Sequence, residues 1–169
     1  MDLQEFVTKY PEEQTCKEKF KELRDTKGVL CPKCGFDDHY WLSTREQYKC
    51  KNCGHRIPMK SGTLLHSSKL PFRYWFIAAQ LIISSTRFST VELQKMLGHK
   101  YYSPIWIMLD KVKKSLVYYE NYYKRKISSA NELLLLPPVK ESELENISEK
   151  SKFLNDDVLI EELEYQYFI

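Results

Sequence analysis

Two cysteine pairs, CPKCG at residues 31–35 and CKNCG at residues 50–54, decide the fold of this 169-residue chain. Fifteen residues separate the pairs, which is a spacing typical of a structural zinc site. Four thiolates complete the tetrahedral shell of a zinc ion and leave no position open for a substrate. The sequence therefore predicts one structural Zn²⁺ held by four ligands: Cys31, Cys34, Cys50 and Cys53.

Other uses of the cysteines agree less well with the sequence. Two disulfides would need an oxidising compartment, and the charged N-terminal segment has no secretory signal character. A redox Cys-x-x-Cys motif needs no second copy, while a rubredoxin-like iron centre would use the same four thiolates. Three nearby histidines are alternative ligands, but four thiolates are already available: His39, His55 and His66. The fifth cysteine, Cys16, shares a helical face with Phe20 and Leu23, so we expect a buried apolar residue.

Short aromatic segments around the second pair predict a small sheet. HYWL at 39–42 and EQYKC at 46–50 suit two strands of a hairpin, and HRIPM at 55–59 suits an edge strand because it contains a proline. Together with the cysteine pairs they outline a three-stranded zinc ribbon. So small a sheet buries little apolar surface, and we expect its folding to require zinc.

Helical patterns surround the ribbon. We expect helices over about 2–10 and 11–24 before it, and after it a helix over about 71–86. STVE at 89–92 is a capping box that opens a short helix ended by Gly98. We expect Ser103 to cap a long third helix that runs to Tyr123, and three aromatic residues to lie in the helical core: Trp75, Phe76 and Trp106.

A capped short helix, a glycine turn and a long helix together form the outline of a helix-turn-helix. In that motif the N-terminal part of the last helix enters the major groove. The predicted DNA contacts are therefore Lys100, Tyr101, Tyr102, Ser103, Lys111, Lys113 and Lys114. Cations around the cysteine pairs are predicted to contact phosphates, although a solvated charged surface is an equal alternative: Lys33, Lys49, Lys51, Arg56 and Lys60.

The net charge of +3 is unevenly distributed along the chain. Residues 1–136 carry 23 Lys and Arg against 14 Asp and Glu, whereas residues 137–169 carry 3 against 9. A basic body with an acidic tail is typical of a nucleic-acid binder that has a separate regulatory or partner segment. The tail would either fold back as a phosphate mimic, bind a protein partner, or remain solvated.

The apolar register of the third helix continues over nearly three heptads, and we therefore hypothesise a homodimer through that helix.

These motifs, in this order, resemble the transposase zinc-ribbon family, the DNA-binding region of bacterial insertion-sequence transposases. The likeness covers about residues 5–116 and includes CPKCG, YKCKNCG, SGTLLH and LPFRYWF. It implies that the ribbon and the helix-turn-helix recognise the terminal repeats of a mobile element. The chain departs from the family pattern where Asp25 and Thr26 follow Arg24, in place of tryptophan and proline, and in a turn before Trp106 that is one residue longer.

Catalysis by the chain itself is not expected. A two-metal strand-transfer site gathers three carboxylates from separate elements of a sizeable domain. Here Asp156, Asp157 and Glu161 all fall in the acidic tail. The chain therefore resembles the binding half of a transposase, acting as a repressor, a transcription factor or the targeting subunit of a split enzyme.

The predicted fold class is α+β, mostly α: a helical lead-in (1–27), a three-stranded zinc ribbon (28–66), a three-helix helix-turn-helix (67–130), and a flexible acidic linker and tail (131–169). The predicted function is sequence-directed binding of double-stranded DNA. The alternative is a zinc-ribbon adaptor that acts through protein contacts. With no apolar run long enough for a membrane span, we expect a cytoplasmic, nucleoid-associated bacterial protein that makes no membrane contact.

Overall fold

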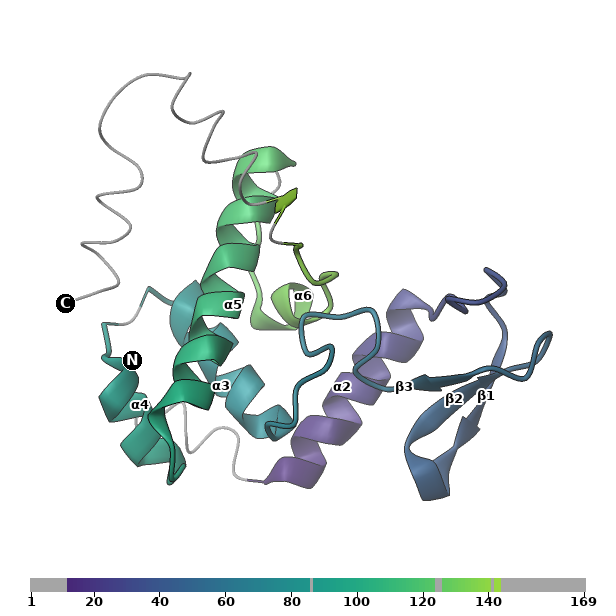
Figure 1. Cartoon of the computed structure of the whole chain (residues 1–169), viewed down its shortest axis with the longest axis horizontal. Coiled ribbons are helices and arrows are strands. Elements are labelled where there is room, and N and C mark those ends of the chain that lie inside the picture. Colours follow the sequence, from purple (N-terminus) through teal and green to yellow (C-terminus); the bar gives the residue numbers. More distant parts are fainter. Residues whose placement is uncertain (1–11, 86, 124–125, 141, 144–169) are drawn as a thin grey trace.

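The computed structural model describes residues 12–85, 87–123, 126–140 and 142–143. It confirms the predicted fold class, because a small antiparallel sheet is followed by helices. The first expected helix (2–10) and residues 144–169 of the acidic tail lie outside the described residues. Within the described ranges, no helix is both long and apolar enough to cross a bilayer. The elements in chain order are α2 (Glu13–Lys27), β1 (His39–Leu42), the 3₁₀ turn η1 (Ser43–Arg45), β2 (Gln47–Cys50), β3 (Arg56–Pro58), α3 (Phe72–Ile83), α4 (Thr90–Leu97), α5 (Tyr102–Tyr122) and α6 (Ala130–Leu134) (Figure 1).

The sheet has the strand order β1-β2-β3, and both pairings are antiparallel. Side chains alternate between its two faces. On the inner face Trp41 pairs with Tyr48, which pairs with Ile57; Tyr48 and Ile57 are buried in a small core with Val29 and two of the cysteines. On the outer face Tyr40, Lys49 and Arg56 form an exposed cross-strand row.

Helix α2 lies between the sheet and the other helices (Figure 1). Toward the sheet, Asp25 accepts a hydrogen bond of 2.8 Å from the Tyr48 hydroxyl, and Lys21 lies 4.9 Å from the centre of the Trp41 ring. Toward the helices, Cys16 and Phe20 are buried, as Cys16 was expected to be. One helix therefore contributes side chains to both parts of the molecule.

The N-terminus of α3 is capped from a distance. Its first residues follow Pro71, whose side chain offers no cap, so the free N–H groups of the first turn need another acceptor. The two oxygens of the Glu13 carboxylate accept hydrogen bonds from the backbone N–H groups of Phe72 at 2.8 Å and Arg73 at 2.9 Å. This contact links α2 to α3 across 59 residues of sequence.

Helices α3, α4 and α5 form the largest apolar core. Most of α3 is buried, including Trp75 and Phe76, which confirms their prediction as core residues. The capping box of α4 is confirmed, because Ser89 and Glu92 exchange both hydrogen bonds. Gly98 ends this helix at a positive φ of 65°, where a side chain would be strained.

Two details of α5 were predicted wrongly. The helix begins at Tyr102 with Tyr101 as N-cap, so Ser103 lies inside the first turn. Trp106 is 41% exposed and does not belong to the core. The buried positions in the N-terminal half of this helix are Ile105, Met108, Leu109 and Val112, and their spacing turns position 106 away from α3.

The leucine run at 133–136 packs into the core, although we predicted a linker and tail from residue 131. Ser129 accepts a hydrogen bond from the Glu132 N–H, and α6 then brings all four leucines against the helices. Lys27 at the end of α2 donates a hydrogen bond of 2.7 Å to the Leu135 carbonyl. The folded unit therefore extends to at least Leu136, because these apolar side chains complete the cover of α3.

Candidate metal centre and nucleic-acid interface

Both cysteine pairs adopt the same turn. In the first, the Cys31 N–H donates to the Phe36 carbonyl at 2.9 Å and the Gly35 N–H donates to the Cys31 carbonyl at 2.8 Å. In the second, the Cys50 N–H donates to the His55 carbonyl at 2.9 Å and the Gly54 N–H to the Cys50 carbonyl at 3.0 Å. The glycine that follows each pair has a φ of about 70°, a left-handed conformation that favours glycine.

The four sulfurs are close enough to share one ion. All four Sγ atoms lie within 4.8 Å of one another. Across the two turns, Cys31 Sγ is 3.6 Å from Cys53 Sγ, and Cys34 Sγ is 3.5 Å from Cys50 Sγ. Zn–S bonds of about 2.3 Å place the sulfurs of a tetrahedral site about 3.8 Å apart. The donor set therefore fits one structural Zn²⁺, as predicted.

Protonation of the thiols opposes metal binding, because only thiolates ligate zinc. The backbone N–H of Phe36 lowers the pKa of Cys34 to about 6, and the neighbouring thiols lower it further. The pKa of Cys53 is raised to about 12: the backbone N–H of His55 lowers it, but desolvation and the other three cysteines outweigh that effect. In the metal-free protein the Cys34 thiolate therefore forms readily, whereas Cys53 keeps its proton until a cation replaces it.

No histidine ring joins the four sulfurs in the described part of the chain. Among the residues that the structure describes, the four cysteines are the only metal-capable cluster. His39, for example, makes a 3.0 Å contact between its Nδ1 and the carbonyl of Asp37. The preference for a four-cysteine site over a histidine ligand is thus confirmed.

Two glycine-ended cysteine turns at one end of a three-stranded antiparallel sheet define a zinc ribbon, whose metal is structural because all four ligand positions come from the protein. Residues 11–56 match the family model of the transposase zinc-ribbon domain, which confirms the resemblance for this part of the chain. This match indicates a nucleic-acid-binding or transposase-related role. Comparison with curated proteins and with solved structures gave no match.

The cations predicted to contact DNA from the ribbon fall into two groups. Lys33, Lys49 and Arg56 are exposed, and Lys51 is exposed but ion-paired with Asp38 at 2.6 Å. Lys60 is different, since its ammonium donates to the carbonyls of Ser68 at 3.2 Å and Leu70 at 2.6 Å. It also lies 4.5 Å from the centre of the Phe72 ring. Lys60 therefore joins two loop carbonyls to the start of α3, and burial lowers its pKa.

The residues predicted to contact DNA from the third helix also divide. Lys100, Tyr101, Tyr102 and Ser103 are all exposed at the N-terminal end of α5. Lys111 instead donates to the His66 carbonyl at 3.1 Å and lies 5.8 Å from the centre of the Trp75 ring. Lys113 is half-buried, and Lys114 pairs with Asp110 at 2.8 Å. The structure thus brings together the residues of the first turn and separates them from the lysines farther along.

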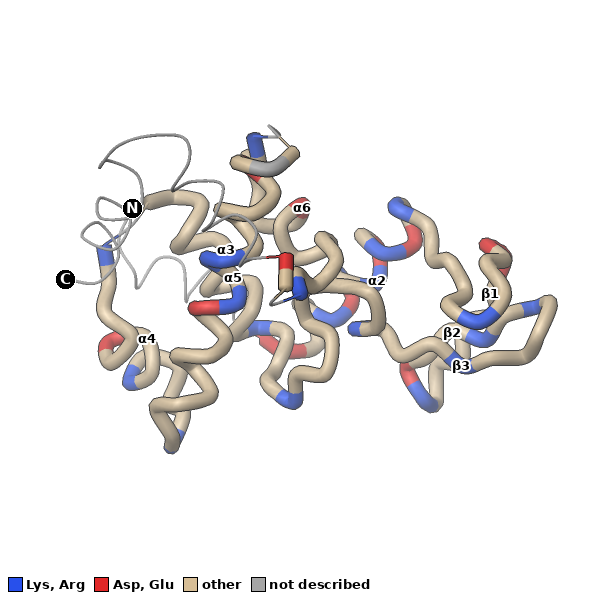
Figure 2. Tube along the Cα trace, turned by 45° about the horizontal axis from the view of Figure 1, so that its top comes forward, with Lys and Arg blue, Asp and Glu red and all other residues tan. Residues whose placement is uncertain are grey.

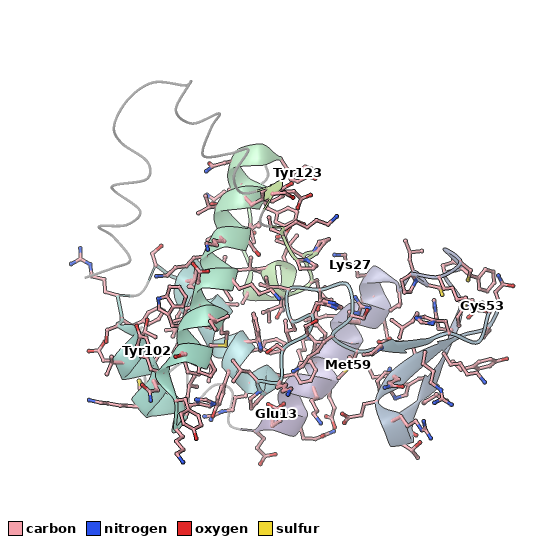
Figure 3. All side chains as sticks on the ribbon, in the orientation of Figure 1. Glu13, Lys27, Cys53, Met59, Tyr102 and Tyr123 are labelled. Atoms are coloured by element: carbon pink, nitrogen blue, oxygen red, sulfur yellow. The ribbon has the colours of Figure 1, made fainter. Side chains whose placement is uncertain are left out.

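The sequence analysis did not predict three exposed apolar residues: Val91 on α4, and Trp106 and Ile107, which follow the first turn of α5. The spacing of the buried residues of α5 could have identified the last two, because positions 106 and 107 fall on the opposite side of the helix. The ribbon site and the α5 turn lie at opposite ends of the molecule, as the labelled Cys53 and Tyr102 show (Figure 3).

Proposed function

We propose that this protein binds double-stranded DNA, with the first turn of α5 entering the major groove and the ribbon contacting the backbone. The observation that carries this proposal is the exposed N-terminal end of α5, presented by a capped α4 in a chain whose preceding segment matches the transposase zinc ribbon. A helix-turn-helix reads bases from the same part of its recognition helix.

The connection between α4 and α5 is braced by side chains, which supports a fixed presentation of this turn. The Gln94 amide donates to the carbonyls of His99 at 3.1 Å and Lys100 at 3.4 Å. The Tyr101 N–H donates to the His99 ring at 3.2 Å. From α3, the Tyr74 hydroxyl donates to the Leu97 carbonyl at 2.9 Å. A rigid turn lowers the entropy that would be lost on binding.

The proposed contacts have separate roles. Tyr101, Tyr102 and Ser103 carry hydroxyl groups that donate to phosphates or bases, and Lys100 supplies a charge that attracts phosphates. On the ribbon, Lys33, Lys49 and Arg56 supply further charge. We propose that the chain targets DNA and does not itself cut or join strands, and that it acts as a repressor, a transcription factor or a targeting subunit.

Selection of bound duplexes from random and genomic DNA tests this function, followed by binding measurements over a range of salt concentrations. The expected result is an enriched sequence and an affinity that falls steeply with salt, because bound cations displace counterions. Lys100→Ala should reduce the salt slope by about 1, whereas Lys126→Ala, an exposed lysine beyond α5, should not. Absence of enrichment together with a flat salt response would refute the proposal.

A second candidate is a zinc-ribbon adaptor that binds another protein. Trp106 and Ile107 favour it, because they expose apolar surface just after the first turn of α5, and Val91 exposes more on α4. An apolar interface would respond weakly to salt, which separates the two candidates. The predicted partner segment in the acidic tail lies outside the described residues.

The predicted homodimer receives no support from the structure. The heptad residues that suggested it are used within the chain: Ile105, Leu109 and Val112 are buried in the core, and Leu116 and Tyr119 pack against it. Sedimentation equilibrium with and without DNA tests this hypothesis, and a strictly monomeric particle in both would refute it.

A further inference from the structure

The outer face of the ribbon sheet carries an aromatic ring within a row of cations. Tyr40 on β1 pairs with Lys49 on β2, which pairs with Arg56 on β3. All three side chains point away from the buried core, and Tyr40 is 58% exposed. Neighbouring strands are about 4.8 Å apart, so the row crosses the sheet over about 10 Å.

Lys51 contacts the Tyr40 ring but adds little net charge to this surface, because it pairs with Asp38. Its ammonium lies 5.1 Å from the centre of the Tyr40 ring and is paired with Asp38 at 2.6 Å. The ammonium therefore holds the ring in place, while its own charge is largely balanced. Lys49 and Arg56 have no such carboxylate partner among the ion pairs of the described residues.

The charge around this row favours an anionic ligand. Residues 28–66 contain six Lys and Arg against three Asp and Glu. Figure 2 shows Lys and Arg positions along the strands of the ribbon. Proteins bind single-stranded nucleic acid by stacking exposed aromatic rings on the bases, while cationic side chains contact the phosphates of the strand.

We propose that this face binds an unpaired base of a DNA strand, with Tyr40 stacking on the base and Lys49 and Arg56 contacting the adjacent phosphates. Within a duplex both faces of a base are covered by its neighbours, so the ring stacks only on a base at a frayed end or in a single-stranded extension. The ribbon and the first turn of α5 lie at opposite ends of the molecule (Figure 3). The face therefore meets a different part of the DNA from the groove reader.

This inference rests on the proposed function, and its test separates the two. Affinities are measured by fluorescence anisotropy for a blunt duplex and for the same duplex with a short oligothymidine overhang. Base–aromatic stacking predicts an affinity about 5- to 150-fold higher for the overhang duplex. Tyr40→Ala should abolish this ratio, and Tyr40→Phe should preserve it because phenylalanine keeps the ring.

Tyr123→Ala is the matched control, because Tyr123 is 57% exposed, carries the same ring and follows the C-terminal end of α5, far from the ribbon. It should preserve the ratio. Zinc content and circular dichroism of each variant establish that the ribbon is folded. As an independent readout, a 2-aminopurine base in the overhang should be quenched by the wild type and by Tyr40→Phe but not by Tyr40→Ala.

The outcomes are distinct. If the blunt duplex binds but the overhang adds nothing, or if the ratio survives Tyr40→Ala in a zinc-loaded protein, the stacking site is refuted and the proposed function stands. If neither DNA binds, the proposed function fails and this site fails with it.

Discussion

Replacing Glu13 with glutamine removes the charge of the carboxylate that caps α3 from α2. This carboxylate accepts two hydrogen bonds, from the backbone N–H groups of Phe72 at 2.8 Å and Arg73 at 2.9 Å. Hydrogen bonds to charged groups contribute about 1.5–3 kcal/mol each, whereas loss of a helix N-cap costs about 0.5–2 kcal/mol. The smaller range applies better here, because water can reach the partly buried site and replace the lost partner. Glutamine keeps one acceptor oxygen, so we expect a loss of about 1 kcal/mol for Glu13→Gln, and about 2 kcal/mol for Glu13→Ala.

Urea denaturation followed by circular dichroism measures this change, and Glu18→Gln is the matched control. Glu18 lies on the same helix, but its carboxylate accepts only an exposed hydrogen bond of 2.8 Å from Gln14. Substitution of such a surface residue changes stability by no more than about 0.5 kcal/mol. If Glu13→Gln is as mild as Glu18→Gln, the long-range cap does not hold α2 to α3.

Three further predictions concern the metal, a thiol and a lysine. Chelation of zinc at neutral pH should unfold the sheet and leave the larger helical core folded, because the buried residues of the ribbon form a small cluster of their own. A change in tryptophan fluorescence with little loss of helical circular dichroism would show this. Burial raises the pKa of the Cys16 thiol from 9.0 to about 11, so the folded state binds this proton more tightly than the unfolded state. The free energy of unfolding should therefore fall as the pH rises from 9 to 11. This fall should be less steep in Cys16→Ala. Lys60→Met should cost about 1–3 kcal/mol in urea denaturation by leaving the Ser68 and Leu70 carbonyls without their donor, and it should leave the salt slope of DNA binding unchanged.

Features set by neighbours in sequence could be predicted from the sequence. The spacing of Cys31, Cys34, Cys50 and Cys53 determines a four-thiolate site, and the glycine after each pair permits its turn. The capping box of α4 needs only Ser89 and Glu92, which are three residues apart. The strands around Tyr48 follow from short aromatic segments. In each case the physical cause acts over a few residues, so the pattern carries the information.

Features set by long-range packing could not be predicted in this way. Nothing near Glu13 in the sequence indicates that its carboxylate caps a helix 59 residues away. Lys60 and Lys111 look like surface cations, yet both donate to loop carbonyls that only the fold brings near them. The leucines at 133–136 resemble the start of a linker because two prolines follow. They are buried because α3 is apolar on more sides than α2, α4 and α5 cover.

Helix α2 packs against both the sheet and the other helices, and it therefore fixes the position of one relative to the other. Its 15 residues span about 22 Å, with the sheet attached through Tyr48 and the helices attached through Phe72. The ribbon and the first turn of α5 therefore cannot move independently, as they would on a flexible linker. A ligand that contacts both therefore meets them at a constant separation, which the length of α2 sets.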